Sequence, residues 1–385
     1  MPEPHALPPL VTRVEPQPPA KPRPGLGEAV LWCVAFFATQ LLAFILVTLI
    51  VLSVFAFQTP NPTQFYLDQL EGVGRAVTRT GPTEPPRPAM PSEIGQAFAW
   101  AMLAAQVASL ILIWLVVPRR VGPDWKRQLG VRRPAAMHLL LIVLLVPGFI
   151  ILTDGVQEMF VRLTGIKQPA ATEALNGVFR NVPVLVTFLA VAFGPGLVEE
   201  VWCRGFLGRG LCARYGLPWG VVLTSLLFGM LHLDPSYLLI TGLMGAYLHF
   251  VYIASRSIWV PLLLHMLNNG IAVFLTLNEE LSALGESFRR DEQNLRAAMD
   301  VAAFSLLLFA SVALWTSRAQ VLPLRDTTAN NELAGSEWHA EYPGVSAPPP
   351  GAPAKLGYAA ISPAAVLLAM AAFGVLAFLL SKLRA

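Results

Sequence analysis

The sequence predicts an all-α fold, specifically a polytopic transmembrane helical bundle. Hydrophobic residues make up 55% of the 385 residues and charged residues only 13%, about half the charged share of a soluble globular protein. The mean hydropathy is +0.57, and long apolar runs recur along the whole chain. Together these observations exclude a disordered protein, a coiled coil and an ordinary soluble enzyme.

Nine apolar runs predict about eight to nine membrane spans. A helix needs about 20 apolar residues to cross a bilayer, and the first run exceeds that length without a single charge. The fourth run continues directly into charged residues, and the fifth is short for a complete crossing. We expect both inside the bundle, facing a water-accessible intramembrane cavity. The nine runs are 29–57, 94–117, 135–152, 182–198, 219–231, 237–254, 258–277, 301–315 and 359–380.

Composition divides the chain into four predicted segments. Residues 1–27 form a proline-rich tail, which cannot bury apolar surface and is expected to be disordered. Residues 28–181 hold the N-terminal transmembrane spans and their loops. Residues 182–277 contain the interrupted spans, where we expect the chemistry. Residues 278–385 read as an appended transmembrane hairpin with a flexible loop at 317–358.

Basic residues predict the orientation of the bundle. Six of them crowd the loop after the second span, between positions 119 and 133, which places that loop and the N-terminus in the cytoplasm. With nine spans, Lys382 and Arg384 fall outside and break the rule. The net charge of +3 is too small to predict a nucleic-acid partner. The preference for Arg over Lys favours a bacterial inner membrane.

The first polar motif inside the apolar region is Glu199-Glu200 followed by Arg204. Ionisable residues within spans are costly and mark functional sites by default. On a helix, Glu200 and Arg204 are four residues apart and can form a charge-assisted pair. Glu199 lies about 100° around the helix and stays outside that pair. The alternative is a helix end at the membrane interface, where charges are ordinary.

Two further motifs place a histidine four residues from a partner. Phe228 can buttress the rotamer of His232, and His265 shares a helix face with Asn269 inside an apolar span. A polar pair at that depth is costly unless the two side chains bond each other, a substrate or water. His249 has no such partner in the sequence and is interpreted as structural.

At these residues the sequence resembles the CAAX protease and bacteriocin-processing (CPBP, also called Abi) family, over about residues 182–277. The resemblance implies an intramembrane endopeptidase with a helical-bundle fold and a water-filled cavity open to the cytoplasm. It also implies that Glu200 and Arg204 support the site by holding their helix in place. The three motifs, in chain order, are Glu199-Glu200-x-x-x-Arg204, Phe228-x-x-x-His232 and His265-x-x-x-Asn269.

The resemblance also implies a role for each of four catalytic residues. Glu199 would be the general base, and His232 its partner on the hydrolytic water. His265 and Asn269 would stabilise the tetrahedral oxyanion. Residue chemistry agrees, because a carboxylate can act as a base and because imidazole and amide groups are suitable oxyanion donors.

A metal mechanism remains the alternative for the same residues. Glu199, His232 and His265 equal a His₂Glu zinc ligand set. No cofactor is favoured, because Asn269 is a poor zinc ligand and a good oxyanion donor. Under the zinc alternative the chain would be a zinc-dependent intramembrane metalloprotease.

The expected partners are the lipid bilayer and a peptide or protein substrate in or at the membrane, including a lipidated one. A proton-coupled transporter is an alternative, but its polar residues should be spread over two related halves, whereas here they concentrate in one stretch. A catalytically inactive bacteriocin-immunity or scaffold protein is a further alternative. The intact set of Glu199, His232, His265 and Asn269 argues against it.

Overall fold

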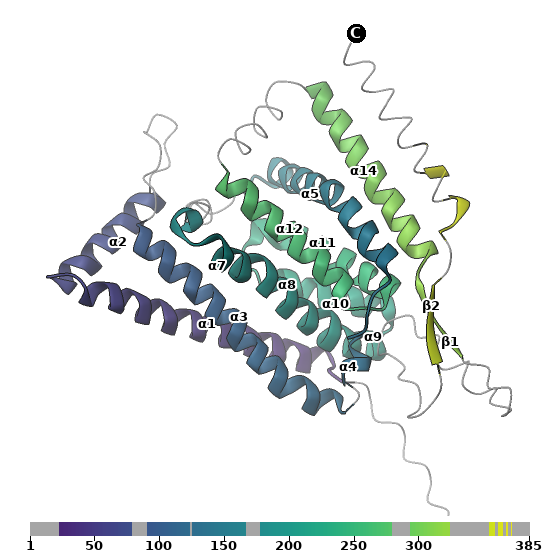
Figure 1. Ribbon diagram of the computed structural model, residues 1–385, viewed down its shortest axis with the longest axis horizontal. Helices are drawn as coiled ribbons and strands as arrows, with labels where there is room; N and C mark the ends of the chain where they lie inside the picture. The colour runs from purple at the N-terminus through teal and green to yellow at the C-terminus, as the bar shows by residue number, and fades with distance from the viewer. Residues whose placement is uncertain are drawn as a thin grey trace, which may run out of the picture.

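The protein is a helical bundle in the computed structural model (Figure 1), which confirms the all-α prediction. Helices α1, α2 and α3 lie on one side, α5 and α14 lie on the other, and the helices between residues 184 and 277 fill the middle. The structure describes residues 23–78, 91–123, 125–166, 178–278, 293–323, 354–358, 361–364, 367–368 and 371. Residues 1–22 of the predicted tail lie outside these ranges.

The N-terminal side consists of a long helical hairpin. Helices α1 (Leu26–Phe57) and α3 (Ser92–Val121) pack along each other, with the end of α3 beside the start of α1. Between them lies α2 (Pro62–Thr78), an amphipathic helix that the search for apolar runs missed. The short helix α4 (Trp125–Gln128) follows α3.

The central helix runs from Val184 to Tyr215 and is not a regular α-helix. Pro195 has no N–H to donate and so disturbs the α-helical ladder around it. In the segment before it, the Gly194 N–H bonds the carbonyl of Leu189, five residues back, which is π-helical geometry. The successive pieces are α7 (Val184–Phe188), η2 (Leu189–Phe193, π), α8 (Gly194–Glu199), η3 (Glu200–Gly208, π) and α9 (Arg209–Tyr215).

Two more hairpins complete the middle of the bundle. Helix α10 (Leu217–Met230) has only 14 residues, as the short fifth run predicted. The chain then turns, with Leu233 at a φ of 55°, into α11 (Pro235–Ser255), which packs against α10. Helix α12 (Trp259–Leu277) contacts α8, η2 and α5. The turn between α10 and α11 therefore places His232 at an inner end of a half-length helix.

The far side of the bundle is formed by α5 (Ala136–Thr164) and α14 (Gln293–Thr316), which pack together. Beyond α14, strands β1 (Ala319–Pro323) and β2 (Ala354–Tyr358) pair antiparallel. They lie at the two ends of the segment 317–358, for which the sequence predicted a flexible loop, and that loop stays a prediction for the residues between the strands. Residues 324–353 lie outside the described residues.

Two large apolar clusters hold the bundle together. One joins α1, α3, η3 and α10 around the buried rings of Phe36, Trp202, Phe206 and Phe228. The other joins α5, α11, α12 and α14, mainly through aliphatic side chains together with the buried ring of Phe149. The interrupted helix contributes Trp202 and Phe206 to the first cluster, and its Glu200 and Arg204 are fully buried.

Within the described residues, six helices are long and apolar enough to cross a membrane, and two shorter apolar helices, Leu217–Met230 and Trp259–Leu275, accompany them. The chain is a multi-pass integral membrane protein. The ninth predicted span, 359–380, lies mostly outside the described residues.

Basic side chains gather at one end of the bundle. Arg209 of α9 donates to Gln128 Oε1 at 2.9 Å and to the carbonyl of Arg23 at 3.1 Å. In the loop after α11, burial and the neighbouring charge of Arg132 lower the pKa of Arg256 to about 10, so the Arg256 guanidinium stays charged at neutral pH. This is the end that the positive-inside rule predicts to face the cytoplasm.

Candidate active site

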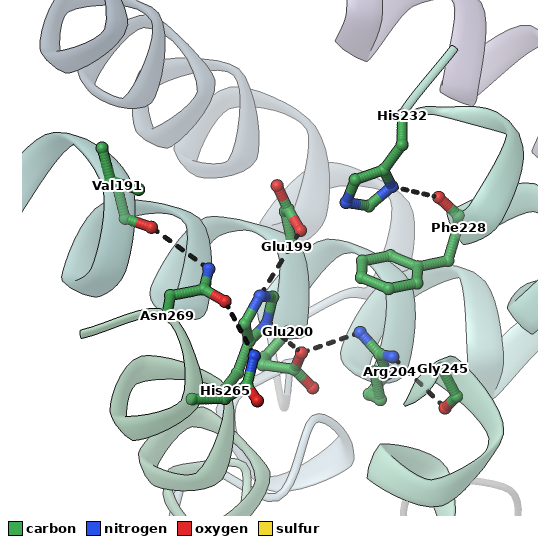
Figure 2. A network of polar contacts seen from close by, with 10 residues as sticks. Val191, Glu199, Glu200, Arg204, Phe228, His232, Gly245, His265 and Asn269 are labelled. Carbon is green, nitrogen blue, oxygen red and sulfur yellow. Dashed lines mark hydrogen bonds and ion pairs between the residues drawn. The ribbon is translucent and has the colours of Figure 1, made fainter. Parts of the chain in front are cut away.

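The seven motif residues converge from three separate helices (Figure 2). Glu199 is the last residue of α8 and Glu200 the first of η3. His232 follows the end of α10, while His265 and Asn269 lie one turn apart in α12. Four-residue spacing predicted the pairs within each motif. The structure brings the three motifs together at one place (Figure 2).

The predicted pair of Glu200 and Arg204 is present and has no solvent exposure. Arg204 Nη1 donates to Glu200 Oε1 at 2.7 Å, and both side chains are 0% exposed. Arg204 Nη2 donates to the carbonyl of Gly245 in α11 at 3.2 Å. The guanidinium also lies over the Phe228 ring, 4.4 Å from its centroid. Because a buried charge is costly without such partners, this arrangement locks η3 against α10 and α11.

Glu200 has a second contact that the sequence did not predict. His265 Nδ1 donates to the same oxygen, Glu200 Oε1, at 2.9 Å. The other ring nitrogen, Nε2, lies 3.9 Å from Glu199 Oε2. The ring of His265 is therefore held between the two carboxylates, with its tautomer set by the Nδ1–H that Glu200 accepts. A second proton on Nε2 would make this ring a donor on the side of Glu199.

His232 is held by the helix that precedes it. Its Nδ1–H donates to the carbonyl of Phe228 at 3.0 Å, and the two rings meet edge to face with centroids 5.0 Å apart. The predicted buttress is therefore present. Figure 2 shows the other edge of the imidazole pointing toward Glu199. Since Nδ1 carries the proton, Nε2 of the neutral ring is an acceptor on that side.

Asn269 is oriented by a backbone carbonyl. Its Nδ2 donates to the carbonyl of Val191 in η2 at 3.1 Å, and its Oδ1 accepts from Asn268 at 3.2 Å. In an α-helix the Val191 carbonyl would bond the N–H four residues on, but that residue is Pro195. The amide of Asn269 takes over that missing bond. Its second N–H hydrogen remains for another acceptor.

Gly196 permits the close approach of α8 and α12 that this geometry requires. A Cβ at this position would lie 3.3 Å from the backbone nitrogen of Met266 and 3.5 Å from the carbonyl of Leu262. Those atoms belong to the turn of α12 that carries His265. Gly196 therefore sets the distance between the glutamates and that histidine.

Solvent can reach one side of this network. The side chain of Glu199 is 18% exposed, whereas Glu200 on its other side is fully buried. His232 is exposed. The two glutamates, adjacent in sequence, thus differ: Glu200 joins the buried network and Glu199 faces the open side.

The zinc alternative requires three ligands that converge on one point. No group of three His, Cys, Asp or Glu side chains within the described ranges is placed so as to hold a metal ion. Nε2 of His265, the nitrogen not bonded to Glu200, lies 3.9 Å from Glu199 Oε2, and the amide of Asn269 on the same helix is a group that zinc does not favour as a ligand. We derive no step through a metal.

His249 lies away from the four candidate catalytic residues. It is fully buried in α11, one turn after Gly245, and feels the charge of Arg204. The interpretation of His249 as a structural residue therefore stays a prediction.

Comparison with known proteins supports the same segment. Residues 181–271 match the type II CAAX prenyl endopeptidase Rce1-like family. The chain is similar to the putative membrane peptidase YdiL of Bacillus subtilis (strain 168), with 25% identity over 183 residues, 46% of this chain and 71% of the relative. It is also similar to the membrane-embedded CAAX protease MroQ of Staphylococcus aureus (strain USA300), with 29% identity over 115 residues, 28% of this chain and 46% of that relative. No solved structure matches.

The class of protein is thus a membrane endopeptidase. Residues 181–271 match the Rce1-like family model, and both relatives are named as membrane peptidases, which confirms the resemblance seen in the three motifs. The alignment with MroQ spans about half the length of that protein.

Proposed function

We propose that this chain hydrolyses a peptide bond of a membrane-associated or lipidated substrate, with Glu199 as general base on a water molecule. One observation carries the proposal most strongly: polar side chains from three helices converge on a single partly exposed carboxylate inside an apolar bundle. All of these side chains lie within 182–277, which we take as the catalytic core. The segment 278–385 is then an appendage to that core.

Water activation rests on two acceptors that face each other. Glu199 Oε2 is a buried oxygen with no hydrogen-bond partner in the described part of the chain, and such atoms call for a water or a ligand. The acceptor edge of His232 points to the same place. One water can donate one hydrogen to each. Glu199 then removes a proton as the water oxygen attacks the substrate carbonyl carbon.

The oxyanion formed by that attack requires donors on the opposite side. We assign this role to Asn269, through its second amide hydrogen, and to His265, through Nε2–H of its doubly protonated ring. Glu200 is a positioning residue, because its charge, fixed by Arg204, supports the His265 imidazolium. Collapse of the tetrahedral intermediate breaks the C–N bond, and the proton held by Glu199 passes to the leaving amine.

The substrate class follows from the position of the site. Glu199 and His232 lie within an apolar bundle, which favours a scissile bond held in the membrane or at its interface. The relative MroQ is named a CAAX protease and the matched family a prenyl endopeptidase. We therefore propose C-terminally prenylated peptides, or peptides anchored in the bilayer, as substrates.

The test compares single-residue variants of the full chain in lipid nanodiscs. The probes are a quenched farnesylated peptide with a C-terminal Cys-aliphatic-aliphatic-X sequence and a quenched peptide with a transmembrane segment. We expect Glu199→Gln and His232→Ala to reduce kcat by at least 10²-fold with thermal unfolding close to wild type. Glu158→Gln, in an exposed ion pair of α5, is the matched control and should cleave normally.

Two results would contradict the proposal. Cleavage by Glu199→Gln at the wild-type rate would contradict the assignment of Glu199 as the general base. Failure of the folded wild-type protein to cleave either probe would exclude the proposed substrate classes. A third probe is the farnesylated peptide without a cleavable scissile bond. It measures substrate binding separately from hydrolysis.

A further inference from the structure

A second polar cavity lies at the basic end of the bundle, away from the candidate active site. Its volume is about 240 Å³. It opens between the first turn of α1, the last turn of α3 and the π-helical segment η3. The residues that line it are Arg23, Pro24, Glu28, Arg119, Arg120 and Phe206.

The charge of this cavity favours an anion. Three arginines line it against one glutamate, and Glu28 pairs with Arg120. Arg119 donates only its Nη1 to the carbonyl of Leu115 in its own helix, so its remaining N–H groups can face the cavity. Arg23 is held in place because its carbonyl accepts from Arg209. Guanidinium groups bind phosphate with paired hydrogen bonds.

The walls below the cavity are suited to an acyl chain. Leu115 and Ile111 share the helix face of Arg119, one and two turns deeper along α3, and they are 39% and 54% exposed. On α1, Leu31 is 70% exposed. Trp32 packs under Arg120, with the guanidinium carbon 5.5 Å from the ring centroid, as aromatic residues do at membrane interfaces. A charged head site thus continues into an apolar surface.

We propose that this cavity binds the phosphate headgroup of an anionic phospholipid of the leaflet that the basic end faces. Basic pockets between transmembrane helices bind such headgroups. A free phosphate compound has the same charged group, but it would leave the exposed stripe along α3 uncovered. The apolar stripe therefore favours a lipid as the source of the phosphate.

Lipid binding here should stabilise the contact between the hairpin and the core. Phe206 is a wall of the cavity and a residue of η3. Its ring lies 6.0 Å from Trp32 of α1 and 5.0 Å from Trp202, also in η3. A headgroup that bridges Arg23, Arg119 and Arg120 ties α1 and α3 together above these rings. The unfolding temperature is therefore a direct readout.

The experiment titrates purified full-length protein in detergent with phosphatidylglycerol, phosphatidylcholine or glycerol phosphate. We expect phosphatidylglycerol to raise the unfolding temperature by about 3 °C and native mass spectrometry to retain one such lipid. Phosphatidylcholine and glycerol phosphate should have little effect. Equal stabilisation by glycerol phosphate would overturn the lipid assignment, and equal stabilisation by phosphatidylcholine would overturn the role of charge.

Two charge variants locate the binding. Arg119→Gln should abolish the response to phosphatidylglycerol, and its exposed side chain bonds only its own helix, so folding should persist. Lys126→Gln combined with Arg127→Gln removes exposed charges of α4 that do not line the cavity and should keep the response. An unchanged response in Arg119→Gln, or its loss in both variants, would overturn the site.

Discussion

Two helices of this protein have the same length of 32 residues and opposite character. Helix α1 is an uninterrupted α-helix in which only 6% of its most apolar window is buried. The helix from Val184 to Tyr215 contains two π-helical segments, and 44% of its most apolar window is buried. The second helix carries both glutamates and Arg204, whereas the one acid of α1, Glu28, lies in its first turn.

The difference shows what an irregular helix requires in a membrane. A regular helix satisfies its own backbone and can face lipid over most of its surface. A helix with π segments frees backbone groups and turns side chains to new directions, so neighbouring protein must supply partners. Here Asn269 supplies one to Val191 and Gly245 supplies one to Arg204. Those enclosing contacts are the same ones that assemble the candidate site.

The largest effect should come from removing the cation of the enclosed helix. Arg204→Met leaves Glu200 as a fully buried anion with only His265 as a partner. We expect a loss of about 3–5 kcal/mol in the free energy of unfolding, together with loss of proteolysis. Thermal unfolding in detergent micelles measures the first effect. A variant as stable as wild type would show that the pair does not hold η3.

The next effect concerns catalysis and the metal question together. Asn269→Ala should lower kcat by about 10²–10³-fold, since it removes the proposed oxyanion donor, whereas Asn268→Ala should stay within a few fold. Extensive chelation should leave wild-type cleavage unchanged. Mild loss in Asn269→Ala, combined with chelator inactivation that added zinc reverses, would replace the glutamate mechanism with a metal one.

A smaller effect is expected from a change in the distance between α8 and α12. Gly196→Val forces α8 away from α12 at Met266 and should cost about 1–3 kcal/mol of stability, with a fall in kcat. Gly27→Val in α1 is the matched control, because a Cβ there meets nothing within 4 Å. Unfolding temperatures and cleavage rates of the two variants decide the matter; similar behaviour would mean that α8 and α12 can separate freely.

The smallest effect should come from the exposed pair at the start of α1. In the absence of added lipid, Arg120→Met removes a partner of Glu28. The side chain of Arg120 is 41% exposed and that of Glu28 is 24% exposed. Solvent screens such a pair, so we expect at most about 1 kcal/mol. Thermal unfolding of Arg120→Met and Arg204→Met under the same conditions compares the two losses of stability directly. A loss as large as that of Arg204→Met would contradict the distinction between the two helices.

Sequence reasoning predicted the regular parts of the fold well. Apolar length located α1, α3, α5 and α14, and it marked α10 as short, because a membrane span follows from hydrophobicity summed over many residues. It missed α2, whose amphipathic pattern has no long apolar run. The paired strands after α14 depend on contacts between residues 30 or more positions apart, which a local composition signal does not contain.

The candidate site was predicted in its residues but not in its connections. Four-residue spacing gave the pairs within each motif, including Glu200 with Arg204 and Phe228 with His232. The bond from His265 to Glu200 joins different helices and depends on their packing. One signal was available and unused: Pro195 leaves the Val191 carbonyl without its usual donor, which indicates that a side chain elsewhere must bond it.

The Val191 carbonyl can also be followed by infrared spectroscopy. Because Asn269 bonds Val191 across two helices, the stretching frequency of an isotope-labelled Val191 carbonyl reports the position of the amide without altering any side chain. Movement of α12 by a fraction of an ångström would lengthen the bond and shift the band. Infrared difference spectra recorded as substrate binds would follow the oxyanion donor in real time.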